Sequence, residues 1–193
     1  MLDNLEKYKV ILASGSPRRR ELMAGLGVNY EVRILPDVDE SYPDTLQGEE
    51  IPLYIAKEKA DAYIPMMQPD ELIITADTIV WQDGKVLGKP RDREDALQML
   101  RTMSGRTHEV FTGVCITTTD WQRSFTAQTE VRFATLSEDE IIYYVDNFKP
   151  MDKAGAYGVQ EWIGFIGVEN ISGSYYNIMG LPVQKLYREL LKV

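Results

Sequence analysis

A short basic segment near the N-terminus holds the residues best suited to bind an anion. Residues 13–20 read Ala-Ser-Gly-Ser-Pro-Arg-Arg-Arg, and the apolar run of residues 10–12 precedes them. This order predicts a strand, a turn of small residues and then a helix whose first amides have no partner within the helix. Such a helix end attracts anions, and the forked guanidinium groups of Arg18 and Arg19 match phosphate oxygens. A capped surface helix with a solvated basic patch is the alternative interpretation.

A carboxylate at the end of a strongly apolar run is the second candidate for chemistry. Residues 72–76 read Leu-Ile-Ile-Thr-Ala, which predicts a strand buried on both faces, and Asp77 follows directly. A buried carboxylate is costly unless it is paired or bound to a metal. The Asp-Gly signal at residues 83–84 predicts a hairpin whose return presents Lys89 toward Asp77. An exposed turn lysine is the alternative for Lys89.

Two loops contain residue types that can hold ligands. The loop at residues 36–44 is acidic, is bounded by prolines and contains Glu40, so its oxygens suit a hard cation. A solvated loop is the alternative, and the sequence by itself favours it. The segment 149–161 has two glycines, two alanines and the amide of Gln160, which would suit the wall of a site for a flat ligand. A pair of tight turns is the alternative there.

The single histidine and the single cysteine are expected to have structural roles. His108 has no second histidine or cysteine nearby, so a zinc site is not expected and a hydrogen-bonding role is. Cys115 cannot form an internal disulfide and lies in an apolar run, which predicts a buried free thiol rather than a catalytic one.

The elements that must position these residues alternate between strands and helices. A capping box at Ser137 predicts the start of one helix, and Pro65 and Pro69 are expected to end another. Strands are predicted at residues 10–12, 28–34, 72–76, 107–119, 123–135 and 163–171, and helices after residue 17 and at residues 51–67, 92–103, 138–148 and the C-terminal end.

Composition excludes several classes of function. The chain has 193 residues, 44% of them hydrophobic, which suits one globular domain or two small lobes. Its net charge of −9 argues against general nucleic-acid binding, because no extended basic surface is available. The N-terminal residues lack the apolar core of a signal peptide, and no segment has the length of a membrane span, so we expect a cytoplasmic protein without membrane partners.

Together, these segments closely resemble the Maf family of nucleoside triphosphate pyrophosphatases. The matching motifs occur in the family's order over nearly the whole chain, at residues 13–19, 56–60, 76–80, 88–90, 103–108, 152–160 and 180–182. The resemblance implies one domain at residues 1–193 with a mixed, twisted central sheet and flanking helices, a fold related to inosine triphosphate pyrophosphatases. Two lobes with the active-site cleft between them are a further expectation.

The resemblance also implies a reaction and its residues. The expected reaction is hydrolysis of a nucleotide between its α- and β-phosphates, with Mg²⁺ or Mn²⁺ as the divalent metal cofactor. By this resemblance, Asp77 stands at the position of the family's catalytic carboxylate, and Glu40 and Asp77 stand at the positions of its metal ligands. The residues that resemble the phosphate clamp are Ser14, Arg18, Arg19, Lys59 and Lys89.

The same resemblance favours dTTP and UTP as substrates. Arg18, Thr78 and Gln160 resemble the specificity positions of the subfamily that acts on these nucleotides, and a glutamine amide matches the edge of a uracil or thymine ring. Glu161 and Trp162 stand where many relatives have a small, glycine-rich continuation, which leaves modified pyrimidines open as substrates. A homodimer is expected by resemblance. The alternative function is a non-catalytic nucleotide-binding regulator of septum formation and cell division.

Overall fold

The computed structural model describes residues 2–36 and 38–193, so Asp37 of the acidic loop lies outside the described residues. Its strands are β1 (Lys9–Leu12), β2 (Glu31–Val32), β3 (Glu71–Gln82), β4 (Lys85–Leu87), β5 (Thr107–Thr117), β6 (Gln122–Phe133) and β7 (Val168–Ser172). Its α-helices are α1 (Pro17–Gly25), α2 (Glu50–Asp61), α3 (Arg93–Met103), α4 (Glu138–Phe148), α5 (Trp162–Gly167), α6 (Tyr175–Ile178) and α7 (Val183–Leu190). Short 3₁₀ helices are η1 (Asp3–Leu5), η2 (Ile64–Met66) and η3 (Ala154–Ala156).

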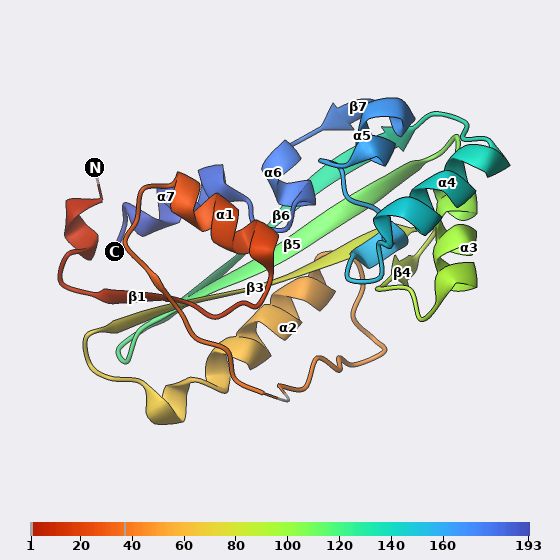
Figure 1. Cartoon of the computed structure of the whole chain (residues 1–193). Coiled ribbons are helices and arrows are strands. Elements are labelled where there is room, and N and C mark those ends of the chain that lie inside the picture. The colour runs from red at the N-terminus through yellow and green to blue at the C-terminus, as the bar shows by residue number, and fades with distance from the viewer. Residues whose placement is uncertain (1, 37) are drawn as a thin grey trace. The chain divides into compact units, whose positions relative to one another are not determined.

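The strands form one mixed sheet, as the sequence predicts. Among the described residues the order is β2-β1-β3-β5-β6-β7, with β4 paired to β3 (Figure 1). β1 is parallel to both β2 and β3, whereas β4 is antiparallel to β3 and β7 is antiparallel to β6. The residues of β1 from Val10 onward and of β3 from Glu71 to Ala76 are buried, which explains their nearly continuous apolar sequence.

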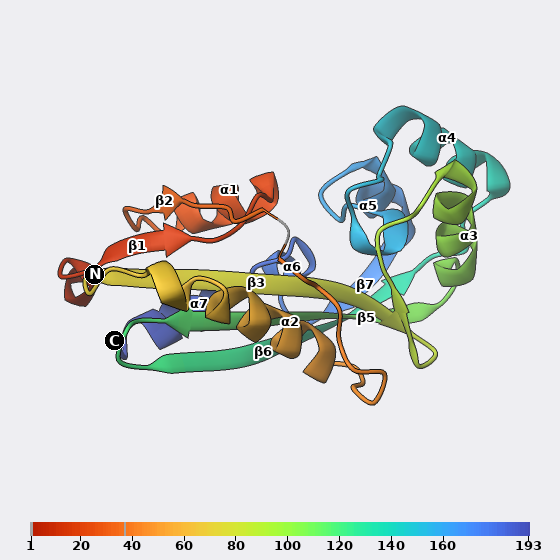
Figure 2. The same ribbon diagram turned by 90° about the horizontal axis from the view of Figure 1, so that it is seen from below.

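The chain divides into two compact units. Unit 1 comprises the described residues up to Asp77 together with Thr112–Ala127 and Gly180–Val193, and unit 2 comprises Thr78–Phe111 and Gln128–Met179. In unit 1, α2 covers one face of the strands and α1 and α7 cover the other face (Figures 1 and 2). In unit 2, α3 packs against α4 and η3. Among the described residues, no helix is both long and apolar enough to cross a membrane.

Several local predictions are confirmed. Ser137 forms the predicted capping box of α4 with Glu140, and the predicted helices α1 and α3 are present, capped by Ser16 and Asp92. The β3–β4 hairpin turns at Asp83 and Gly84, which both have positive φ as a two-residue primed turn requires. These features come from short-range chemistry, and for that reason the sequence predicts them.

Three predictions about elements are wrong. The strand expected at residues 163–171 is a helix as far as Gly167, and only Val168–Ser172 is a strand. The helix expected at residues 51–67 ends at Asp61, and a 3₁₀ turn follows at Ile64–Met66. The strand expected at residues 28–34 is reduced to Glu31–Val32. Pro65 explains the second difference, because a proline disfavours the helical conformation of the residue before it and cannot donate a backbone hydrogen bond.

Candidate active site

One ammonium group and two carboxylates meet in unit 1. Lys59 Nζ lies 2.9 Å from Asp77 Oδ1 and 2.7 Å from Glu40 Oε1. The side chains of Lys59 and Asp77 are each only 14% exposed, whereas Glu40 is 55% exposed. The Lys59–Asp77 pair is therefore more than a solvated surface ion pair. Removing Lys59 would leave the largely buried Asp77 carboxylate without this partner, and removing Asp77 would leave Lys59 with only the exposed Glu40 carboxylate. The structure thus brings together three of the residues that the resemblance selects.

Two contacts in unit 1 hold α2 where Lys59 reaches Asp77. Thr75, two residues before Asp77, donates a hydrogen bond of 2.6 Å from its hydroxyl to the Ala56 carbonyl, three residues before Lys59. At the other end of the helix, a Cβ on Gly113 of β5 would lie only 2.3 Å from the Pro52 carbonyl oxygen. The backbone of α2 therefore approaches β5 more closely than any side chain at position 113 would allow.

The turn before α1 has the geometry of an anion site. Ser16 is the N-cap and its hydroxyl accepts a hydrogen bond of 3.4 Å from the Arg19 amide, while the Ser16 amide donates to Ser14 Oγ at 3.2 Å. Pro17 occupies the first turn of the helix, where its missing N–H has no partner to lose. Ser14 is buried and Arg18 is half-buried. The N-terminal end of a nine-residue helix thus carries two hydroxyls and adjacent guanidinium groups.

Arg19 has structural partners that the sequence does not predict. Its Nε donates to the Gly180 carbonyl at 2.7 Å, and one terminal nitrogen donates to the Ala76 carbonyl at 2.9 Å. Burial lowers the pKa of Arg19, and the nearby Asp77 carboxylate acts in the opposite direction. Arg19 therefore fixes the backbone directly before Asp77, in addition to any role as a phosphate ligand.

In unit 2, the segment that contains Gln160 is tied to the segment that contains Lys89. The Gly155 amide donates to the Gly88 carbonyl at 3.0 Å, and Lys89 itself is exposed. Gly155 has φ +68°, and a Cβ there would lie 3.0 Å from Val80, two residues after Thr78. The Gln160 Oε1 atom is buried and finds no hydrogen-bond partner among the described residues. The predicted approach of Lys89 to Asp77 stays a prediction.

His108 has the hydrogen-bonding role that the sequence predicts. Its Nε2 lies 2.7 Å from the Tyr157 hydroxyl, and its ring packs edge-on against Phe133. Burial lowers the pKa of His108 to about 4 and raises the pKa of Tyr157, so both groups are neutral at pH 7. Burial also raises the pKa of Cys115 to about 11, as expected for an inert buried thiol.

Glu40 and Asp77 suit a divalent cation only if a bound phosphate group supplies further oxygen ligands. In the described part of the chain, no group of three or more His, Cys, Asp or Glu side chains could hold a metal ion by itself. Glu40 and Asp77 nevertheless both contact one ammonium group, so their oxygens converge on a single position of positive charge. Mg²⁺ commonly binds one or two carboxylates together with substrate phosphates and water. The two carboxylates therefore suit a cation that arrives with a phosphate group.

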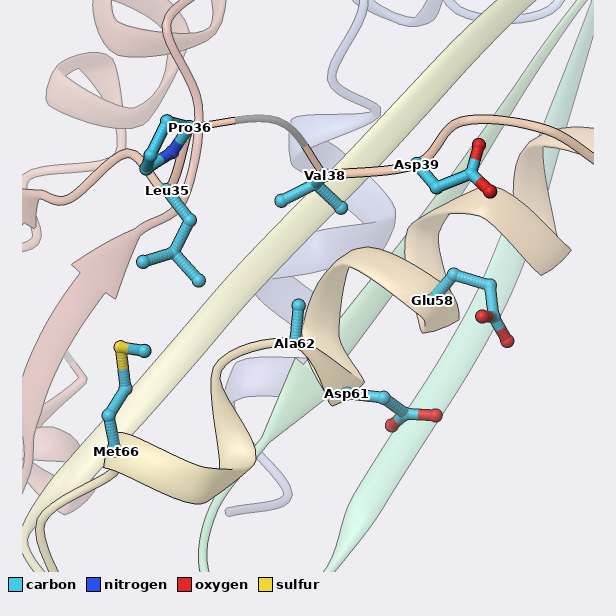
Figure 3. A pocket seen from close by; sticks show the side chains of 8 residues that line it. All are labelled: Leu35, Pro36, Val38, Asp39, Glu58, Asp61, Ala62 and Met66. Carbon is cyan, nitrogen blue, oxygen red and sulfur yellow. The ribbon is translucent and has the colours of Figure 1, made fainter.

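A separate pocket of about 520 Å³ lies beside the outer face of α2 in unit 1 (Figure 3). It is lined by Leu35, Pro36, Val38, Asp39, Glu58, Asp61, Ala62 and Met66. None of the predicted site residues lines it, and in Figure 3 the carboxylates of Glu58 and Asp61 point away from the apolar side chains of the loop. Two of the lining residues, Asp39 and Glu58, directly precede Glu40 and Lys59 in the sequence, but the cluster itself does not line the pocket.

Comparison with known proteins identifies the family. Residues 9–193 match the family described as Maf-like protein. This chain belongs to the Maf family. It is 72% identical over 193 residues to the dTTP/UTP pyrophosphatase of Bacteroides thetaiotaomicron, covering 100% of both chains. It is 71% identical over 190 residues to the protein of the same name from Bacteroides fragilis and 48% identical over 188 residues to that of Flavobacterium johnsoniae, covering at least 96% of each chain.

Solved structures confirm the predicted fold. The Ham1 protein of Staphylococcus aureus matches with a TM-score of 0.51 and 17% identity, covering 94% of this chain and 99% of that one. A Ham1 protein from Coxiella burnetii matches with a TM-score of 0.50 and 14% identity, covering 96% and 100%. At these identities the likeness concerns the fold alone.

Two Maf-family motifs have structural roles that sequence reasoning missed. Gly180, in the motif at residues 180–182, has φ +109° and supplies the carbonyl that Arg19 binds. Gly155, in the motif at residues 152–160, makes the close approach to Val80. The available signal was the glycine itself, because a glycine in a motif often marks positive φ or close backbone contact.

Proposed function

We propose that this chain hydrolyses dTTP and UTP to the nucleoside monophosphate and pyrophosphate. The observation that carries the proposal is the convergence of Lys59, Asp77 and Glu40 in unit 1, where a cation and two carboxylates lie within ion-pair distance. Full-length relatives that are about 70% identical bear the name dTTP/UTP pyrophosphatase, which supports the same reaction. In this reaction, water adds to phosphorus, the α–β phosphoanhydride bond breaks and pyrophosphate leaves.

The polyphosphate is proposed to bind the cationic residues. Phosphoryl transfer depends mainly on positioning and on stabilising charge at the phosphate oxygens. The residues proposed to contact these oxygens are Ser14, Arg18, Arg19, Lys59 and Lys89. Of these, Ser14 and Arg18 belong to the capped turn at the start of α1, where backbone amides add further donors.

Asp77 is the proposed general base. Its carboxylate would accept a proton from the attacking water, and Lys59 would hold it in place through the 2.9 Å contact. Glu40 and Asp77 would hold a divalent cation, Mg²⁺ or Mn²⁺, which when bound supplies positive charge beside the phosphate oxygens. Arg19 would contribute through the Ala76 carbonyl, because that contact fixes the backbone on which Asp77 stands.

The base is proposed to be recognised by Arg18, Thr78 and Gln160. Uracil and thymine present an N3–H donor between two carbonyl acceptors, whereas cytosine presents an acceptor at N3. The buried Gln160 Oε1 would accept from N3–H, and the amide nitrogen would donate to a neighbouring carbonyl. With cytosine, two acceptors would face each other, which a buried site tolerates poorly.

The deciding experiment measures pyrophosphate release from dTTP, UTP, CTP, GTP and 7-methyl-GTP with Mg²⁺ or Mn²⁺. Turnover of dTTP and UTP above the other nucleotides is expected. A matched pair of variants tests the site: Asp77→Asn should lose activity, and Asp61→Asn, on the exposed side of α2, should not. Turnover of 7-methyl-GTP alone would refute the substrate assignment, and nucleotide binding without any turnover would favour the regulatory alternative. A homodimer and a cytoplasmic location are proposed from resemblance alone.

A further inference from the structure

Three side chains in unit 2 form a hydrogen-bonded cluster behind the segment that contains Gln160. The Tyr144 hydroxyl, from α4, donates to Glu161 Oε2, and Lys153 Nζ lies 3.2 Å from Glu161 Oε1. Tyr144 is fully buried and Lys153 is 8% exposed. Lys153 also pairs with Asp152 at 2.8 Å. We call Tyr144, Lys153 and Glu161 the Glu161 cluster.

The Glu161 cluster is coupled to the backbone on both sides of Gln160. The Gly158 amide donates to the Tyr144 hydroxyl oxygen at 2.9 Å, so the phenol bridges Gly158 and the Glu161 carboxylate. The Glu161 amide in turn donates to the Gly158 carbonyl at 2.9 Å, and the Glu161 carbonyl accepts from Gly164 at 2.9 Å. The segment 158–161 is therefore held at each end by the same glutamate.

The side chains of Glu161 and Lys153 pack closely against Gly158. A Cβ on Gly158 would lie 2.9 Å from Glu161 Cδ and 3.1 Å from Lys153 Cε. Burial and the adjacent Glu161 carboxylate raise the pKa of Tyr144, so the phenol keeps its proton and remains a donor. A largely buried carboxylate with a lysine and a phenol as partners is held firmly, because losing either partner would leave it poorly satisfied.

Glu161 directly follows Gln160, at a position where the family resemblance implies a small, glycine-rich continuation in many relatives. We propose that Glu161 is a positioning residue that fixes Gln160 for base recognition, so that the enzyme prefers uracil and thymine over cytosine. The inference rests on the proposed function, since it assumes that Gln160 reads the base. Its physical basis is pre-organisation: an amide held in place discriminates donor from acceptor, whereas a mobile amide can turn to suit either.

The test compares kcat and KM for UTP and CTP in Glu161→Ala, Glu161→Gln and Tyr144→Phe. In Glu161→Ala, the ratio of the two kcat/KM values should fall about tenfold, mainly through a higher KM for UTP, with kcat for UTP nearly unchanged. Glu161→Gln keeps an acceptor for Tyr144 and should retain most of the preference. Glu138→Ala removes a carboxylate that pairs with Arg101 at the start of α4, and it serves as the control that should leave the ratio unchanged.

A second variant pair tests whether Glu161 acts through Gln160. Gln160→Ala should reduce the preference for UTP, and adding Glu161→Ala should reduce it no further. An unchanged ratio in folded Glu161→Ala would overturn the inference and leave the proposed function intact. If Glu161→Ala does not fold, Tyr144→Phe decides instead, because it removes the hydroxyl that bridges Gly158 and Glu161: the ratio should fall in this variant, and an unchanged ratio would overturn the inference. If the unmodified protein turns over neither nucleotide, the proposed function fails and the inference fails with it.

Discussion

The contact between α2 and Gly113 gives a sharp test of how the site is positioned. In Gly113→Ala, the new methyl group would lie 2.3 Å from the Pro52 carbonyl oxygen and 2.4 Å from the Leu53 nitrogen. Ordinary contacts of a Cβ begin at 3.4 Å, so α2 or β5 must move by about 1 Å. All three of the nearest atoms belong to the backbone, and no side-chain rotation can relieve the clash.

The structure sets the size of the expected effect. Overpacking of this kind costs about 1–3 kcal/mol, which for a chain of this length lowers the melting temperature by about 2–12 °C. Lys59 lies about two turns along α2 from Pro52, and a helix moves largely as a rigid body. A displacement of about 1 Å at Lys59 would disturb its contacts with Asp77 and Glu40 and lower kcat by about 100-fold.

The assay combines thermal unfolding with pyrophosphate release from UTP. Gly25→Ala is the matched control, because a Cβ at this last residue of α1 meets nothing within 4 Å. We expect that variant to be as stable as the unmodified protein or slightly more stable, with full activity. Full stability and full activity in Gly113→Ala would refute the reasoning. Lower stability with unchanged kcat would show that the contact between α2 and Gly113 does not determine the position of Lys59.

Three further predictions follow from single residues. Asp77→Asn should lower kcat at least 100-fold and lower the melting temperature, because Lys59 then keeps only Glu40 as a carboxylate partner; near-native pyrophosphate release would contradict the assigned role. His108 has a folded-state pKa of about 4 against 6.5 in the unfolded chain. The contribution of neutral His108 to the free energy of unfolding is therefore fully present above pH 6.5 and is lost as the pH falls toward 4. That loss amounts to about 3 kcal/mol, and urea unfolding of His108→Gln should show a shallower pH dependence than the unmodified protein. Because burial raises the pKa of Cys115 to about 11, an alkylating reagent at pH 8 should label the folded protein slowly and the urea-unfolded protein fast; equal rates would contradict its burial.

The parts of the fold that the sequence predicted depend on local chemistry. The capping box of α4, the cap of α3 and the Asp83–Gly84 turn each involve residues within four positions of one another. β3 is predicted because a strand buried on both faces needs a continuous apolar run. Such signals can be recognised in a single sequence, because the residues that determine the local conformation are neighbours in the sequence.

The helix α5 was missed because backbone contacts override its local preference. Ile163, Phe165 and Ile166 are β-branched or aromatic residues that favour a strand. In the structure, however, the Gly164 amide donates to the Glu161 carbonyl, and a Cβ on Gly164 would lie only 1.8 Å from the Val159 carbonyl oxygen. The chain therefore turns back on itself here, a constraint that hydrophobic periodicity does not report.

In the candidate site, too, the sequence motifs predicted some features and only the structure shows others. Motif resemblance selected Lys59, Asp77 and Glu40, and the structure brings these three together. The motifs did not predict that Arg19 donates hydrogen bonds to the carbonyls of Ala76 and Gly180. Gly180 is 161 positions away from Arg19, and every residue type has a backbone carbonyl, so the sequence does not mark which one is bound. Contacts of a side chain to distant backbone are set by the fold and leave little trace in the sequence.

Gln160 and the Glu161 cluster belong to unit 2, whereas Lys59 and Asp77 belong to unit 1, which would allow specificity to change while the chemistry stays the same. Four of the residues proposed to contact phosphate, Ser14, Arg18, Arg19 and Lys59, lie in unit 1, whereas Glu161 lies in unit 2. The Glu161 cluster is built from Tyr144 and Lys153, which belong to that same unit, so its formation requires no change in the residues around Asp77. A substitution in the cluster should therefore alter which base is accepted before it alters the rate of bond cleavage. If substitutions in the Glu161 cluster change the UTP-to-CTP ratio of kcat/KM but leave kcat for UTP unchanged, the cluster acts independently of the residues around Asp77.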